Sequence, residues 1–238
     1  MSLDVPFKIE TFDALPSTQD LMRERLESGE NVHGLVIRAL KQSAARGQRR
    51  RDWWAGPGGS YQTLAVKDLA PPVLNKPHAA ILVALGLAQT LPEYGIQVGI
   101  KWPNDLHYKD KKVAGILCEY VRGHLLAAVG MNVNNDVPEG ATALRGLDTE
   151  GVSNFVLAGM QRGLELMTEE VDLPAAFAPF DVLKSQEVEV ELGGKLKRGV
   201  ADGLDEKGCL RLEDAGTITL ICHGQVGRSS LKRVISSQ

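Results

Sequence analysis

Apolar and polar positions along the first three quarters of the chain predict strands interspersed with helices. Short apolar runs predict strands at residues 7–15, 34–40, 61–66, 98–101, 112–120 and 125–133, the last two joined by a hairpin turn at Arg122-Gly123. Apolar residues spaced three or four positions apart predict a helix that follows Ser17 and stops at Gly29, a second at 77–91 and a third at 153–170. Ser17 is the expected N-cap of the first helix. The expected fold is therefore α/β (α+β), with a mixed sheet backed by helices.

The pattern changes after Pro179 to short runs in which apolar and polar residues alternate. These runs predict strands at 188–192, 196–204, 209–213 and 217–222, separated by turns. About fifty residues of this kind suit a small, closed, five-stranded barrel. We therefore expect two domains, residues 1–182 and residues 183–238.

The composition is that of a soluble globular protein. Hydrophobic residues make up 43% and charged residues 24% of the 238 positions, which excludes a disordered chain. The formal net charge of -3 argues against general binding to nucleic acid or membranes. Residues 1–7 have no signal-peptide core and no stretch has the length of a membrane span, so the cytoplasm is the expected location. The three cysteines, Cys118, Cys209 and Cys222, are widely spaced, and neither a disulfide nor a zinc site is expected.

A long polar segment at residues 41–60 is the first candidate for chemistry. It carries Arg46, Arg49, Arg50 and Arg51, which could neutralise a polyphosphate together with backbone amides, and Trp53, which offers a flat face for stacking a base. Taken alone, such a loop is more often a solvated basic loop or a nucleic-acid patch than a nucleotide site.

The second candidate is Lys101-Trp-Pro-Asn-Asp105, which is followed closely by Lys111 to Leu117. Asn104 and Asp105 at a strand end could hold Mg²⁺ or ribose hydroxyls, and Lys112 could direct its ammonium group into the same space. Gly115 within an apolar strand suggests that a ligand approaches the backbone closely. The alternative is an ordinary turn beside two solvated lysines.

Together these segments resemble the motifs of biotin protein ligases. Residues 42–53 look like that family's glycine- and arginine-rich ligand loop, and residues 101–105 match its Lys-Trp-Pro-Asn-Asp signature. Residues 112–117, residues 129–134 and the pair Ser17-Thr18 resemble three further motifs, in the family's order and spacing, and the similarity runs from about residue 11 to 231. The chain departs from the family pattern at Gln19, Ala45, Gln48 and Arg50, and at residues 225–229, where the family has a Gly-x-Val-Ser-like ending.

The resemblance implies a catalytic domain like that of class II synthetases, followed by a C-terminal SH3-like barrel. It implies that biotin and ATP react to biotinyl-5′-AMP, with Mg²⁺, and that the biotinyl group then passes to a lysine of an acceptor protein. Lys112 and Arg46 are the implied catalytic residues, and Asp105 is the implied metal ligand. The implied biotin-binding residues are Ser17, Thr18, Gln42, Arg46, Trp102, Lys112, Gly115 and Leu117. The implied ATP-binding residues are Arg49, Arg51, Trp53, Asn104, Asp105, Lys112 and Asn132.

The resemblance also implies partners and leaves alternatives open. The expected acceptor is a biotin carboxyl carrier protein, no nucleic-acid or membrane partner is expected, and a homodimer stays open. The nearest alternative is a lipoyl or octanoyl ligase or transferase of the same fold. A biotin-sensing transcription factor is disfavoured because about six residues precede the first strand, which leaves no room for a helix-turn-helix. A single-stranded nucleic-acid module using the arginine loop is disfavoured by the net charge.

Overall fold

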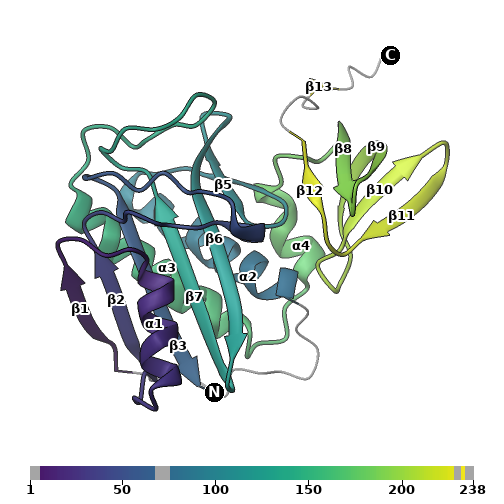
Figure 1. Ribbon diagram of the computed structural model, residues 1–238. Helices are drawn as coiled ribbons and strands as arrows, with labels where there is room; N and C mark the ends of the chain where they lie inside the picture. Colours follow the sequence, from purple (N-terminus) through teal and green to yellow (C-terminus); the bar gives the residue numbers. More distant parts are fainter. Residues whose placement is uncertain (1–5, 68–75, 228–231, 234–238) are drawn as a thin grey trace.

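A computed structural model of the protein describes residues 6–67, 76–227 and 232–233, and its largest element is a seven-stranded mixed sheet (Figure 1). The strand order is β1-β2-β3-β7-β6-β5-β4. β1 runs parallel to β2, and the other neighbouring strands are antiparallel. The strands are β1 (Lys8–Phe12), β2 (Leu35–Ala39), β3 (Ser60–Lys67), β4 (Gly99–Lys101), β5 (Asp105–Tyr108), β6 (Lys111–Val121) and β7 (His124–Met131). The mixed sheet predicted from the sequence is confirmed.

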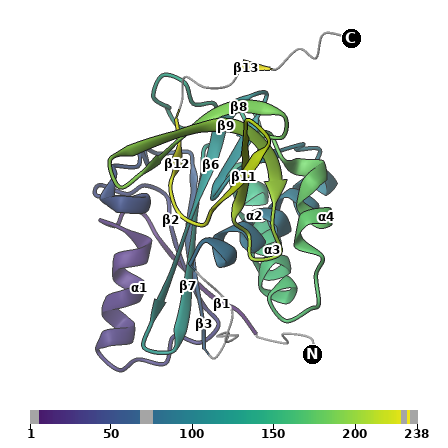
Figure 2. The ribbon, with the colours of Figure 1, turned by 90° about the vertical axis from the view of Figure 1, so that its right-hand side faces the viewer.

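Helices cover both faces of this sheet, as Figures 1 and 2 show from two directions. Helix α1 (Thr18–Glu27) packs on one face, where Met22 and Leu26 join a small apolar cluster with residues of β2, β3 and β7. Helices α2 (Lys76–Thr90) and α3 (Thr149–Leu166) cover the other face and form the main core with its strands. Ser17 caps α1 as predicted, because its side chain accepts a hydrogen bond from the backbone N–H of Asp20 at 3.2 Å. No helix among the described residues is long and apolar enough to cross a membrane.

Glycines allow α2 and α3 to pack closely. A Cβ added to Gly86 of α2 would lie 2.3 Å from the carbonyl oxygen of Gly159 and 2.3 Å from the backbone nitrogen of Gly163, both in α3. The two backbones therefore approach where these three glycines meet. This close packing makes the helical layer a rigid support behind the sheet.

The C-terminal strands form a second sheet in the order β11-β10-β9-β8-β12, with β13 also paired to β8. The strands are β8 (Gln186–Leu192), β9 (Lys195–Leu204), β10 (Leu210–Asp214), β11 (Thr217–Ile221), β12 (Gln225–Val226) and β13 (Lys232–Arg233). Within the described residues this sheet is open, so the predicted closed five-stranded barrel is not confirmed. Helix α4 (Leu173–Phe177) and three short 3₁₀ turns, at Gln48–Arg50, Leu91–Tyr94 and Ala178–Phe180, complete the secondary structure of the described residues.

The prediction that the cysteines form no disulfide is wrong. Cys209 and Cys222 are bonded to each other across the β10–β11 hairpin, in which Leu210 pairs with Ile221. Because the two cysteines flank that residue pair, the register of the hairpin brings them together. Cys118 is free and buried, and burial raises the pKa of its thiol to about 12, which agrees with a core residue rather than a nucleophile.

Strand β5 and helix α3 differ from what the sequence pattern predicts. Strand β5 was not expected as a separate strand, because Asp105 and His107 interrupt its apolar pattern, yet it pairs with both β4 and β6. Helix α3 begins at Thr149 rather than at residue 153, since Asp148 caps it by accepting the backbone N–H of Gly151 at 2.6 Å. The same helix ends at Leu166 rather than at residue 170.

Candidate active site

A cavity of about 390 Å³ lies beside the sheet, on the face that carries α1. Its walls come from the start of α1, the arginine-rich loop, strands β5, β6 and β7, the turn at 138–141, and strand β12 of the C-terminal sheet. Every predicted site residue lines it: Ser17, Thr18, Gln42, Arg46, Arg49, Arg51, Trp53, Trp102, Asn104, Asp105, Lys112, Gly115, Leu117 and Asn132. The structure thus brings together residues that lie up to 115 positions apart in the sequence, which is the separation of Ser17 from Asn132.

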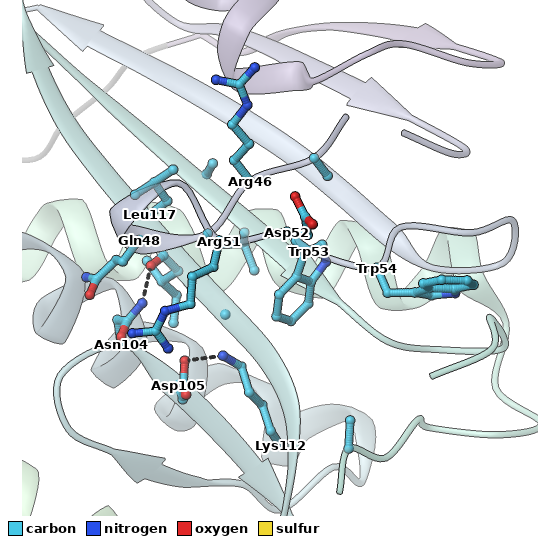
Figure 3. A pocket seen from close by; sticks show the side chains of 18 of the residues that line it. Arg46, Gln48, Arg51, Asp52, Trp53, Trp54, Asn104, Asp105, Lys112 and Leu117 are labelled. Atoms are coloured by element: carbon cyan, nitrogen blue, oxygen red, sulfur yellow. Dashed lines mark hydrogen bonds and ion pairs between the residues drawn. The ribbon is translucent and has the colours of Figure 1, made fainter. Parts of the chain in front are cut away.

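The β5–β6 hairpin forms the charged end of the cavity. The ammonium Nζ of Lys112 lies 2.6 Å from Oδ1 of Asp105 (Figure 3). The side chain of Lys112 is 31% exposed and that of Asp105 is 24% exposed. A bulge between Leu106 and His107 shifts the strand register just before His107 pairs with Lys112. The amide of Asn104 donates to the carbonyl oxygen of Ile116 at 2.8 Å. Asn104, Asp105 and Lys112 are therefore held in fixed positions by neighbouring strands.

Trp53 lies across two glycines in the floor of the cavity. A Cβ on Gly130 of β7 would lie 2.8 Å from Nε1 of the indole, and one on Gly115 of β6 would lie 3.1 Å from its Cζ3. The Lys112 ammonium lies 5.1 Å from the centroid of the same indole, a cation–π distance. The indole Nε1 is buried and has no hydrogen-bond partner among the described residues. The close approach expected at Gly115 is thus made by Trp53.

A polar cluster at the start of α1 forms the opposite end. The backbone N–H of Thr18 donates to Oε1 of Gln42 at 2.7 Å, and the hydroxyl of Thr63 donates to Oγ1 of Thr18 at 2.9 Å. Ser17 and Thr18 are 5% and 3% exposed, so this cluster is almost closed to solvent. Leu117 adds an apolar wall beside it. This end can bind a compact polar group with several donors and acceptors.

The arginine-rich loop folds over the mouth of the cavity. Its ends are tied by the backbone N–H of Gly47, which donates to the carbonyl of Arg51 at 2.7 Å, and by that of Trp53, which donates to Ala45 at 3.0 Å. In Figure 3 the side chain of Arg51 extends toward Asn104 and Asp105, whereas that of Arg46 points away from them. Arg49 instead forms an ion pair of 3.5 Å with Glu191 of β8. The loop therefore contacts the C-terminal sheet directly.

Two predicted ligand residues, Trp102 and Asn132, are also held by hydrogen bonds to neighbouring segments. Trp102 is 1% exposed, and its Nε1 donates to the carbonyl oxygen of Gly208 at 3.0 Å, which joins the large sheet to the C-terminal one. Asn132 is 3% exposed, donates to the carbonyl of Thr142 at 3.2 Å and accepts from the amide of Asn135 at 3.0 Å. These hydrogen bonds fix both side chains in the absence of a ligand.

Several residues of the cavity were not predicted. His107 of β5 lines it, and burial together with the charge of Lys101 lowers the pKa of this imidazole to about 4, so it is neutral beside Lys112. Gly224, Gln225 and Val226 also line it, from a segment nearly 100 residues after the β7 strand. No local motif marks these three residues, whereas His107 could have been found from its position two residues after Asp105.

No group of three or more His, Cys, Asp or Glu side chains within the described ranges is arranged to hold a metal ion. Asp105 lies in the cavity beside an ammonium group rather than beside a second carboxylate that would share a metal with it. A cation could therefore be held there with further ligands from a phosphate-bearing substrate, which is the way Mg²⁺ is commonly bound.

The chain belongs to the biotin/lipoate A/B protein ligase family, whose model matches residues 11–136. It is 31% identical to the bifunctional ligase/repressor BirA of Bacillus subtilis, over 84% of this chain and 68% of that protein. It is 28% identical to the biotin--[acetyl-CoA-carboxylase] ligase of Mycobacterium tuberculosis, over 88% of this chain and 85% of that one. Among solved structures, the biotin protein ligase from Aquifex aeolicus in complex with biotin and ATP has a TM-score of 0.80 at 27% identity, covering 95% of this chain and 99% of that chain. The resemblance drawn from the sequence motifs is confirmed.

Proposed function

We propose that this chain is a biotin protein ligase, which activates biotin with ATP and transfers the biotinyl group to a lysine of an acceptor protein. The observation that carries the proposal is a cavity with the Lys112–Asp105 ion pair at one end and the buried Thr18–Gln42 cluster at the other. A cavity of this kind suits a substrate with a carboxylate at one end and a compact polar ring at the other. Biotin and ATP are the substrates.

The first step joins the carboxylate of biotin to the α-phosphorus of ATP. The oxygen–phosphorus bond forms as pyrophosphate leaves, which gives biotinyl-5′-AMP. Negative charge increases on the phosphoryl oxygens in the transition state, and a fixed cation beside them lowers the barrier. Lys112 supplies this cation, because Asp105 and the Trp53 ring hold its ammonium inside the cavity.

The second step transfers the biotinyl group to the acceptor. The neutral amine of the acceptor lysine attacks the carbonyl carbon of the anhydride, AMP leaves, and the nitrogen loses a proton as the amide forms. Lys112 polarises the carbonyl during this attack. The backbone near Arg46, with Ser17, Thr18 and Gln42, binds the ring, while Trp102 and Leu117 line its apolar part. Orientation of both reactants at one site supplies further acceleration.

The nucleotide occupies the part of the cavity below the arginine-rich loop. Arg49 and Arg51 bind its phosphates, Trp53 covers adenine, and Asn104 and Asn132 bind its polar groups. Binding of ATP therefore competes with Glu191 for the guanidinium of Arg49. Asp105 would be the ligand from this chain for a Mg²⁺ ion that accompanies ATP, and the ion would neutralise phosphate charge.

The two sheets belong to two domains with different roles. Residues 1–182 form the catalytic domain, and residues 183–238 form a domain of the SH3-like barrel kind that closes the site and receives the acceptor. Support comes from the contacts of Gly208 with Trp102 and of Glu191 with Arg49, and from the cavity lining at 224–226. The acceptor is a biotin carboxyl carrier protein.

The test is transfer to a purified biotin carboxyl carrier domain, followed by intact mass. Biotin, ATP and Mg²⁺ are expected to add one biotinyl group, and a carrier whose target lysine is replaced by arginine is expected to stay unmodified. Lipoate in place of biotin is expected to give no product. Transfer of lipoate to a lipoyl domain, without any biotinylation, would overturn the proposal in favour of a lipoyl ligase.

A further inference from the structure

Gln19 is a buried residue of the cavity that has no role in the mechanism above. It is the second residue of α1, it is 5% exposed, and it lines the cavity beside Thr18. Its amide Nε2 donates to Oε2 of Glu119, on β6, at 3.1 Å. Its carbonyl Oε1 is buried and has no hydrogen-bond partner within residues 6–67, 76–227 and 232–233.

The contacts behind Gln19 fix which end of its amide faces the cavity. A carboxylate accepts hydrogen bonds and donates none, so the NH₂ end must face Glu119. Glu119 is itself held by an ion pair with Arg23, one turn further along α1. Oε1 is therefore left as an acceptor on a side chain that cannot turn over without breaking its bond to Glu119.

Buried acceptors in folded proteins nearly always have a donor, and one without a donor calls for an explanation. Here the residue borders a cavity that is built for a ligand. The donor that completes the hydrogen bonding of Gln19 would then come from the ligand. This requires a ligand group with an N–H or O–H at the Gln19 end of the cavity.

Strand β6 indicates which part of the substrate lies there. Lys112 and Leu117 both line the cavity, and five residues of strand span about 16 Å. Glu119 lies two residues beyond Leu117 and so on the same face of the strand. A substrate whose carboxylate lies at Lys112 therefore places its far end, the ring, near Gln19.

We propose that Gln19 is a specificity-determining residue whose Oε1 accepts an N–H of the substrate's cyclic urea, and that Glu119 and Arg23 are positioning residues that hold it. The inference rests on the proposed function. A urea ring carries two N–H donors, whereas the dithiolane ring of lipoate carries none. Binding lipoate would leave Oε1 buried and unpaired, so Gln19 favours a urea over a dithiolane.

The first test compares Gln19→Met, which keeps the length of the side chain and removes its hydrogen bonds, with wild type in biotin-dependent pyrophosphate exchange. KM for biotin is expected to rise about tenfold, with KM for ATP and kcat within twofold. Gln161→Met, on α3 and outside the cavity lining, is the matched control and is expected to leave both KM values unchanged. A biotin KM within twofold of wild type in Gln19→Met would overturn the proposal.

The second test uses two biotin analogues in which one or the other ring N–H is replaced by oxygen. Wild type is expected to bind one of them about tenfold more weakly than its isomer, since oxygen would face Oε1, and Gln19→Met is expected not to distinguish the two. Glu119→Leu, which frees the amide to turn, is expected to lose the same discrimination, and Glu119→Gln, which still offers an acceptor to Nε2, is expected to retain it. Unchanged discrimination in both Gln19→Met and Glu119→Leu would refute the role of Gln19. Absence of exchange in wild type would instead refute the proposed function itself.

Discussion

Reduction of the Cys209–Cys222 disulfide is expected to destabilise the protein by about 3 kcal/mol. The two cysteines are separated by 13 positions, and a cross-link that closes a loop of this size lowers the conformational entropy of the unfolded chain by an amount worth about 3 kcal/mol at 25 °C. For a chain of this length each kcal/mol shifts the melting temperature by about 2–4 °C. The reduced protein should therefore melt about 6–12 °C below the oxidised one.

The assay is thermal unfolding, followed by circular dichroism, with and without a thiol reductant. The double variant Cys209→Ser/Cys222→Ser is expected to melt at the temperature of the reduced wild type and to be insensitive to reductant. Cys118→Ala, which removes the free cysteine and keeps the disulfide, is the control and should show the full response to reductant.

Counting thiols provides the independent check on this prediction. The unfolded, unreduced protein should contain one reactive thiol per chain, that of Cys118. Three reactive thiols, or a melting temperature that reductant leaves unchanged while one thiol is counted, would refute the reasoning. Three reactive thiols would show that the disulfide is absent. An unchanged melting temperature would show that the disulfide does not stabilise the protein.

Three further predictions concern packing, pH and the loop. Gly86→Ala should lower the free energy of unfolding by about 3 kcal/mol or more in urea titrations, because the new Cβ would meet the backbone of α3. A smaller loss would contradict that close packing. In the folded protein the pKa of His107 is about 4, so its imidazole stays neutral at a pH where the unfolded chain is already protonated. The free energy of unfolding should therefore fall by up to about 3 kcal/mol as pH decreases from about 6.5 to 4. His107→Gln should flatten this pH dependence, and an unchanged slope would count against burial of His107 as its cause. The loop at 46–51 is expected to become ordered over the cavity as a lid when biotin and ATP bind. Trypsin should therefore cut it more slowly in their presence, and equal cleavage would contradict this ordering.

The sequence predicted most of the sheet because its strands are apolar runs with clear ends. Strand β5 was missed since it has only four residues, of which Asp105 and His107 interrupt the apolar pattern, and it is recognised by its backbone pairing with β4 and β6. A pattern of side chains cannot reveal a strand whose identity lies in backbone pairing. The same strand carries Asp105 toward Lys112, so the missed element is the one that assembles the charged end of the cavity.

The residues that line the cavity were named from the sequence where they lie in motifs, and they were missed where their place in the cavity depends on tertiary structure. Residues 101–105 and 112–117 are joined by a tight turn in which Lys109 and Asp110 both have positive φ, so their proximity follows from the hairpin. Gly224 to Val226 reach the cavity from the C-terminal sheet, which no local pattern announces.

The cysteines show a different limit of sequence reasoning. Their odd number and wide spacing in a chain expected to be cytoplasmic argued against a disulfide, and the structure contains one. The expected strands at 209–213 and 217–222 already held the relevant signal, because an antiparallel hairpin with a central turn places its first residue opposite its last. Register within a predicted hairpin was a better guide than the count of cysteines.

The central claim is that this cavity forms an acyl adenylate with Lys112 as the catalytic cation. The most direct measurement is biotin-dependent exchange of labelled pyrophosphate into ATP by wild type, Lys112→Ala and Lys111→Ala, the last a control at the exposed neighbouring lysine. Exchange should require biotin, fall by about 10²–10³-fold in Lys112→Ala, and stay within twofold of wild type in Lys111→Ala. Folded wild-type protein that shows no exchange in the presence of Mg²⁺, or a Lys112→Ala variant that exchanges at the wild-type rate, would contradict the account.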